Sequence, residues 1–208
     1  MSIARFVLDS DTFIRSKREH YGFAICPGFW DALDCFFNRG HLCSIVPVRN
    51  ELLKGPADDL AEWVKERAPE GFFVPADEPE VVEAFREVMA WMESQPQYTE
   101  AAKERFASGA DPWLIAYAAV KRCILVTYEQ PAPTSQKSVK IPDAADVLGV
   151  KCCPVHEMLT YLRTELVLMP PVELALEQAE DHLVATSESD DEAELASELL
   201  DPDDEPLF

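Results

Sequence analysis

Short apolar runs alternate with longer amphipathic segments along most of this chain. The runs at Ile3–Leu8, Leu42–Val46 and Cys123–Tyr128 have the length and composition of buried strands. Weaker runs at Gly71–Val74 and Ser138–Ile141 predict two further short strands. Because strands of a parallel sheet are buried on both faces, they form near-continuous apolar runs of this kind. The pattern therefore predicts a mostly parallel sheet covered by helices on both sides.

Between these runs, apolar residues recur three or four positions apart, which is typical of amphipathic helices. Asp111 is expected to be the N-cap of one helix, with Pro112 at its first helical position. The fold class expected for residues 1–170 is α/β, a three-layer α/β/α sandwich around a central sheet. The predicted helices cover Pro27–Phe37, Pro47–Lys54, Asp58–Arg67, Pro79–Glu93, Asp111–Arg122 and Val155–Leu166.

The distribution of charge separates the end of the chain from the rest. The net charge is -21, but residues 171–208 hold 14 of the 39 acidic residues and no Lys or Arg. This composition predicts an acidic C-terminal tail, partly helical or disordered, after a domain at residues 1–170. The domain retains 25 acidic and 18 basic residues, so its mild charge does not exclude a nucleic-acid partner.

The sequence also bears on where the protein resides. No apolar run approaches the ~20 residues of a membrane span, and the N-terminus lacks the pattern of a signal peptide. The six cysteines show no CxxC spacing, which favours reduced thiols. A cytoplasmic protein without a membrane partner is therefore expected.

Four acidic residues fall where the carboxyl ends of the predicted strands meet. Asp9 ends the first strand, and Glu51 lies one helical turn beyond the second. Asp111 begins the helix that leads into the Cys123–Tyr128 strand, and Glu129 follows that strand. Functional groups of parallel sheets gather at this edge. Four carboxylates there would repel one another unless a divalent cation shared them, and oxygen ligands suit Mg²⁺ or Mn²⁺. All four are therefore predicted as catalytic residues and metal ligands.

The order and context of these acids resemble the PIN-domain ribonucleases over about residues 3–168. VLDSDTFI is similar to the opening strand of that superfamily, SIVPVRNEL to its glutamate helix, GADPWLIAYA to its Asp-x-x-Ile-Ala helix and LVTYE to its last strand. The segments HYGFAICPGFWDAL, NELLKGPADDLAEWV and KIPDAADVLGV further resemble an uncharacterised PIN-like family of bacteria and archaea, regarded as toxins of type II toxin–antitoxin pairs.

The resemblance implies a PIN-like fold and a metal-dependent endoribonuclease that leaves a 5′-phosphate and a 3′-hydroxyl. It also implies an RNA substrate, such as tRNA, and a cognate antitoxin as partner. It leaves open whether the protein forms a homodimer. Ser10 and Thr127 are expected to hydrogen-bond to the carboxylates or to phosphate. Arg15, Lys17 and Arg18 are expected to meet RNA phosphates, which dominate nucleic-acid affinity.

Two residues depart from the PIN pattern. Asp11 stands where many PIN domains have Asn, and Glu129 is one methylene longer than the more usual Asp. The reach of Glu129 leaves open a non-catalytic PIN-like scaffold that binds RNA or protein.

A second enzymatic interpretation is also open. DSDTF resembles the first motif of haloacid-dehalogenase phosphatases, in which Asp9 would be the nucleophile and Asp11 the general acid. The last motif of that superfamily, an acidic pair after a strand, has no clear counterpart here. The candidates for its lysine and for the acidic pair are Lys137, Lys140, Asp143 and Asp146.

Overall fold

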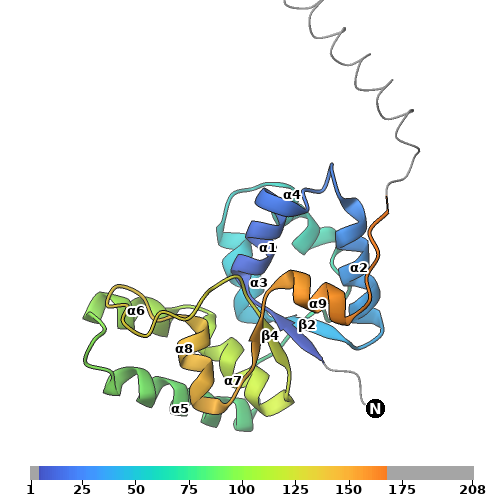
Figure 1. The fold of residues 1–208 in the computed structure, drawn as a ribbon. Helices are drawn as coiled ribbons and strands as arrows, with labels where there is room; N and C mark the ends of the chain where they lie inside the picture. The colour runs from blue at the N-terminus through green and yellow to red at the C-terminus, as the bar shows by residue number, and fades with distance from the viewer. Residues whose placement is uncertain (1–4, 168–208) are drawn as a thin grey trace, which may run out of the picture. The chain divides into compact units, whose positions relative to one another are not determined.

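Within residues 5–167, which the computed structural model describes, five short strands form one sheet in the order β3-β2-β1-β4-β5, and every pairing is parallel (Figure 1). Phe6 of the central strand pairs with Leu42 on one side and with Ile124 on the other. The strands are β1 (Phe6–Leu8), β2 (Leu42–Ile45), β3 (Phe73–Val74), β4 (Ile124–Val126) and β5 (Cys152–Cys153).

Four of the predicted strands are confirmed, with shorter bounds, and one is wrong. The Ser138–Ile141 run does not enter the sheet, because Ile141 begins a helix with Pro142 in its first turn. Val139 is buried, so the apolar signal there comes from a loop residue that packs into the core. The fifth strand lies instead at Cys152–Cys153, where two residues between Lys151 and Pro154 form no longer apolar run.

The helices lie on the two faces of the sheet. Figure 1 shows α1–α4 together on one side and α5–α8 on the other, which confirms the predicted three-layer α/β/α class. The helices are α1 (Ser10–Arg15), α2 (Pro27–Asn38), α3 (Val46–Lys54), α4 (Asp59–Glu62), α5 (Pro79–Ser94), α6 (Glu100–Ser108), α7 (Asp111–Lys121), α8 (Ile141–Ala145) and α9 (Val155–Tyr161). Two π-helical segments, η1 (Ser16–His20) and η2 (Trp63–Arg67), and a 3₁₀ turn, η3 (Asp146–Leu148), continue α1, α4 and α8.

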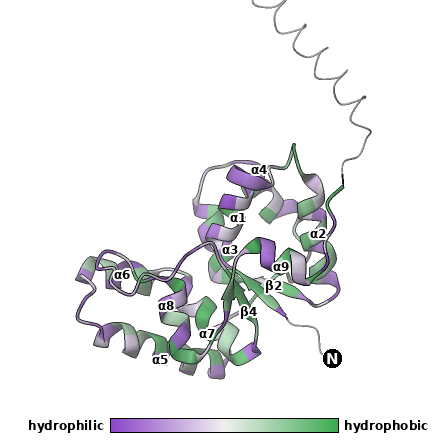
Figure 2. Ribbon diagram, in the orientation of Figure 1, coloured by the Kyte–Doolittle hydropathy of each residue, from purple (hydrophilic) through white to green (hydrophobic). Residues whose placement is uncertain are grey.

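Aromatic packing holds the α1–α4 layer on the sheet. Phe13 of α1 is fully buried, and its ring centroid lies 5.9 Å from that of Trp63 and 6.2 Å from that of Phe72. Trp30 and Phe29 of α2 are also fully buried. Figure 2 shows the apolar strands and the hydrophilic outer faces of the helices. Burial of each large side chain contributes about 1.5–3 kcal/mol to the stability of the fold. This packing fixes the position of α1 and of its first residues on the sheet.

Residues 5–165 belong to one compact unit. The acidic tail predicted at residues 171–208 lies outside the described residues. Within residues 5–167, no helix is both long and apolar enough to cross a membrane.

Candidate functional site

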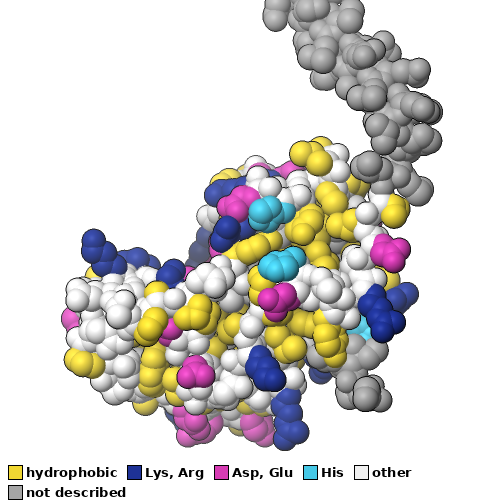
Figure 3. Space-filling model, viewed as in Figure 1, with side chains coloured by type: hydrophobic (Ala, Val, Ile, Leu, Met, Phe, Trp, Pro, Cys, Tyr) yellow, Lys and Arg dark blue, Asp and Glu magenta, His cyan; other side chains and the backbone are white. Residues whose placement is uncertain are grey.

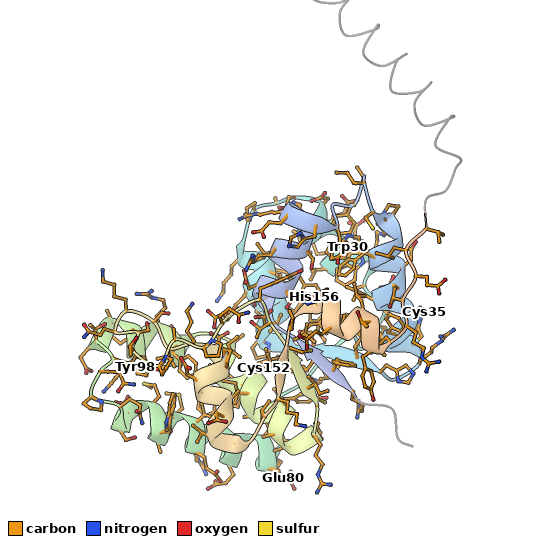
Figure 4. The ribbon with its side chains drawn as sticks, in the orientation of Figure 1. Trp30, Cys35, Glu80, Tyr98, Cys152 and His156 are labelled. Carbon is orange, nitrogen blue, oxygen red and sulfur yellow. The ribbon has the colours of Figure 1, made fainter. Side chains whose placement is uncertain are left out.

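The order in which the strands are added to the sheet reverses between β1 and β4. From β1 the chain runs outward to β2 and β3, and then returns to the other side of β1 to form β4 and β5. In open α/β sheets, ligands bind at the carboxyl ends of the strands on either side of such a switch point. Here these ends carry Asp9 and Thr127, and the Asp9 N–H donates to the Val126 carbonyl at 3.2 Å. α9 begins directly after β5, so His156 near its start lies at the same edge (Figure 4).

Asp9 is the most buried acid of the site, with 2% of its surface exposed. It is also the N-cap of α1, because its Oδ1 accepts a hydrogen bond from the Thr12 N–H at 2.6 Å. Burial raises the pKa of Asp9 to about 7, although hydrogen bonds from Thr12 and Thr127 act in the opposite direction. The carboxyl group therefore has a defined orientation but an environment that disfavours its charge.

Asp111 is the first residue of α7, and the prediction that it caps this helix is wrong. The N-cap is Ala110, and it makes no side-chain capping bond. No donor within residues 5–167 hydrogen-bonds to the Asp111 carboxylate. Burial raises its pKa to about 7, and repulsion from Asp9, Glu51 and Glu129 adds to this effect. The sheet edge thus brings the four predicted acids close enough to act on one another.

Glu51 connects three segments at this edge through hydrogen bonds. From α3, its Oε1 accepts a hydrogen bond from the Ala110 N–H at 2.7 Å, and its Oε2 accepts one from the Ser10 hydroxyl. Ser10 opens α1 and Ala110 precedes α7, so Glu51 sets the distance between the helices that carry Asp9 and Asp111. The expectation that Ser10 hydrogen-bonds to a carboxylate is met.

Glu129 has a different environment from the other three acids. Its Oε1 pairs with the Lys140 ammonium at 2.7 Å, and its Oε2 accepts the Ile141 N–H at 2.8 Å. The Glu129 N–H donates to the Thr127 hydroxyl oxygen at 3.0 Å. Lys140 therefore belongs to the site, although the sequence suggested a role for it only in the phosphatase interpretation.

The donor set of the site fits a hard divalent cation. As the side chains stand, no three His, Cys, Asp or Glu residues within 5–167 enclose a metal position. Mg²⁺, however, is commonly held by one or two carboxylates and keeps several of its waters. Asp9 and Asp111 are such a pair, because each resists ionisation alone and a cation would relieve both. Glu51 stands behind them, already engaged by two donors.

The three predicted RNA-binding residues differ in their contacts. Lys17 forms ion pairs with Asp58 at 2.6 Å and Asp59 at 2.5 Å, so its charge is already neutralised. Arg15 pairs with Glu19 at 2.9 Å and stacks over the Tyr128 ring at 4.6 Å. Arg18 is exposed and makes no ion pair with any residue from 5 to 167.

Charge is correspondingly dispersed on the face of the molecule that Figure 3 shows. In Figure 3, the Lys and Arg side chains on the visible face are scattered among acidic and apolar ones and form no continuous basic surface. Arg18 lines a small cavity of about 50 Å³ together with Glu51, which places it near the acidic edge. Lys17 lines the same cavity, but Arg18 differs from it in having no ion-pair partner within residues 5–167.

The residues of the phosphatase interpretation have structural partners. The side chain of Asp11 is 42% exposed and lies 3.9 Å from Arg15. Asp143 Oδ2 accepts the Ala132 N–H at 2.9 Å and so closes the loop that follows β4. Asp146 and Lys137 are exposed. The candidate general acid and the candidate acidic pair thus already serve to hold local structure or lie in solvent.

Fold and site together define a class of protein: a three-layer α/β/α sandwich with a carboxylate cluster at the switch point of its parallel sheet. A family model described as a domain of unknown function (DUF4411) matches residues 6–166, and the chain belongs to this family. The match runs from β1 through α9 and includes all four acids. Neither the curated proteins nor the solved structures gave a significant match. The family's description names no activity, so the resemblance to PIN-domain ribonucleases stays a prediction.

Proposed function

We propose that this protein is a metal-dependent endoribonuclease whose site is built around Asp9 and Asp111. The observation that carries the proposal is the pairing of the buried Asp9 with the partly buried Asp111 at the switch point, each with its pKa raised to about 7. Such an arrangement destabilises the protein unless a cation or a proton is shared there. Perturbed carboxylates at a sheet edge are a common mark of functional sites.

The residues of the site would divide the work as follows. A bound Mg²⁺ or Mn²⁺ supplies a more acidic water and counter-charge for the phosphate and the leaving oxygen. Asp9 is oriented for this role by the Thr12 N–H and Thr127. Asp111 receives no hydrogen bond from residues 5–167, so its oxygens remain able to accept a proton or a hydrogen bond from water. Glu51 keeps the two aspartates together through its bonds to the segments that carry them.

The substrate and partners in this proposal follow from the resemblance to PIN-like toxins. RNA, such as tRNA, would be cut to leave a 5′-phosphate and a 3′-hydroxyl. The partner would be a cognate antitoxin, the compartment the cytoplasm, and the active form could be a homodimer. Arg18 near the acidic edge supports a phosphate-bearing substrate, because it is an exposed cation without an ion-pair partner within residues 5–167.

The test is cleavage of a mixed tRNA and structured-RNA pool by the purified, antitoxin-free protein. Reactions would contain Mg²⁺, Mn²⁺ or EDTA, and would compare the wild type with Asp9→Asn and Asp111→Asn. Glu80→Gln is the matched control, because Glu80 is exposed on α5 away from the carboxyl edge, close to Glu78, which pairs with Lys121 at the far end of α7 (Figure 4). We expect metal-dependent cutting that both Asp variants lose and the control keeps.

The same preparation separates the other two interpretations. A phosphatase with Asp9 as nucleophile would form an acid-stable, hydroxylamine-sensitive phosphoaspartate and would release phosphate from monoesters. A binding scaffold would retain RNA affinity without cutting under any metal condition. Either result, obtained with folded protein, would refute the nuclease proposal.

A further inference from the structure

Lys140 is held at the acidic edge by the backbone on both sides of it. It precedes α8 in an extended conformation, and Pro142 at the start of α8 restricts the backbone that follows. α8 packs against α5 and α7 through the buried residues Ala144 and Ala145. The preceding loop is closed by the bond from the Ala132 N–H to Asp143. The backbone position of Lys140 is therefore defined by the fold, and its ammonium is held by the Glu129 carboxylate.

The Lys140 ammonium is paired with the Glu129 carboxylate, which a second metal ion would need as a ligand. Lys140 Nζ lies 2.7 Å from Glu129 Oε1, and the Ile141 N–H takes Oε2. The side chains are only 32% and 22% exposed, so this pair is more strongly coupled than a surface ion pair. A divalent ion placed on Glu129 would lie against a positive charge a few Å away. The geometry thus disfavours Glu129 as a direct metal ligand.

The charge of Lys140 reaches beyond Glu129. It also acts on Asp111 and on Asp11, so Lys140 lies within electrostatic reach of both carboxyl groups. Lys17 is already neutralised by Asp58 and Asp59. An ammonium has three N–H donors, and Lys140 donates one of them to the Glu129 carboxylate. The remaining donors are free to meet an anion that arrives beside Asp111.

A pocket adjoins this ion pair. It has a volume of about 280 Å³ and is lined by Glu129 and Thr127 from the end of β4, Cys152 and Cys153 from β5, and Pro142 from α8. Figure 4 shows Cys152 near α8 at the centre of the molecule. Its size is close to the lower end of small-ligand sites, which suits a single nucleoside. A substrate seated there would bring a neighbouring phosphate toward Lys140.

We propose that Lys140 is a catalytic residue and that its ammonium takes the place of a second metal ion, so that one divalent ion at Asp9 and Asp111 and one lysine at Glu129 together bind the scissile phosphate. This inference rests on the proposed nuclease function. Lys140 donates hydrogen bonds to a non-bridging phosphate oxygen and neutralises the charge that develops there. Groups of this kind act most strongly in a partly desolvated site.

Two measurements test it. Electron paramagnetic resonance titration of Mn²⁺ into the intact protein should give one bound ion per chain; two ions of similar affinity would overturn the inference whether or not the protein cuts RNA. In cleavage assays, Lys140→Met should lower kcat about 100-fold, as loss of one oxyanion donor does, with the affinity for Mn²⁺ kept within about threefold. Lys137→Met, an exposed lysine of the same loop, is the matched control and should cut like the wild type.

Lys140→Met leaves the Glu129 carboxylate without its ion-pair partner, which could itself disturb the fold. The double variant Lys140→Met/Glu129→Gln removes both charges and should show the same loss of kcat as the single variant. Wild-type cutting by either variant would overturn the role of Lys140. Absence of cutting by the wild type would instead refute the nuclease proposal, and the Mn²⁺ count would remain the test of one ion against two.

Discussion

Asp111→Asn is expected to stabilise the metal-free protein. The substitution keeps the size and shape of the side chain and removes its charge. Within residues 5–167, it breaks no hydrogen bond, because the carboxylate accepts none there. What it removes is the cost of holding a negative charge in a partly buried position beside Asp9, Glu51 and Glu129. Residues that serve a ligand often reduce stability in this way when the ligand is absent.

The size of the effect follows from the pKa. A rise from 3.8 to about 7 is roughly 3 units, and each unit corresponds to about 1.4 kcal/mol, so the limit is about 4 kcal/mol. The side chain is partly exposed, and solvent screening reduces that limit. Asp9 also shares the repulsion and would relax once its neighbour is neutral. We therefore expect a gain of about 1–3 kcal/mol in the free energy of unfolding at pH 8.

The gain should depend on pH in a defined direction. In the unfolded chain, Asp111 releases its proton near pH 4, whereas in the folded protein it keeps the proton up to about pH 7. Because the folded state binds more protons in this interval, its stability falls as the pH rises from about 4 to 7, and the deficit is complete above pH 7. Asn has no proton to lose. The advantage of the variant should thus be near zero at pH 4 and largest at pH 8.

The assay is urea unfolding followed by tryptophan fluorescence, in EDTA, at pH 5 and pH 8. Glu80→Gln is the control for loss of a carboxylate far from the site. Mg²⁺ should then stabilise the wild type by an amount that grows with its concentration, about 2.7 kcal/mol at 100 times Kd, and should stabilise Asp111→Asn less. A variant no more stable than the wild type at pH 8, or a gain that does not grow between pH 5 and pH 8, would refute the reasoning.

Three further changes probe other contacts. Ser10→Ala removes a donor from the partly buried Glu51 carboxylate and should cost about 1–2 kcal/mol in urea unfolding; an unchanged midpoint would mean that this bond does not hold α1 to α3. Phe13→Ala should cost about 3–5 kcal/mol, seen as a lowered Tm, because the ring is fully buried; a loss below 1 kcal/mol would contradict the packing described. Lys17→Met should leave RNA affinity nearly unchanged, since Lys17 is already paired, whereas Arg18→Ala should weaken binding and lower the slope of log K against log salt by about one. Equal effects of the two changes would show that the ion pairs of Lys17 open when RNA binds.

The sequence was sufficient for the sheet where a strand lies within a longer apolar run, and insufficient where it does not. β1 and β4 are buried throughout or nearly so, and their apolar runs predicted them. β5 has two residues and produces no periodicity. α6 was not predicted because EAAKERFAS buries only Ala102 and Phe106, so its apolar face is too narrow to be visible in the sequence.

For the site, the order of the acids along the chain placed them correctly at one edge, since topology alone determines which residues follow the strands. Their partners could not be predicted. Glu51 meets Ala110 across 59 positions, and Lys17 meets Asp58 across 41, and neither pairing leaves a local pattern. Lys140 is the clearest case: the sequence offered it only as a candidate lysine of the phosphatase interpretation, and nothing local predicted its pairing with Glu129.

The pairing of β1 with β4 has a consequence during synthesis. Phe6 can pair with Ile124 only after most of the domain has been made. The hydrogen bond from the Asp9 N–H to the Val126 carbonyl requires the same strand, β4. At translation rates of about 5–20 residues per second, the nascent chain passes several seconds without Asp111 or β4. A fragment that stops before Asp111 has β1 as an open edge and lacks one residue of the aspartate pair. The carboxylate cluster can therefore assemble only after β4 at Ile124–Val126 has been made, which is well past the middle of the 208 residues.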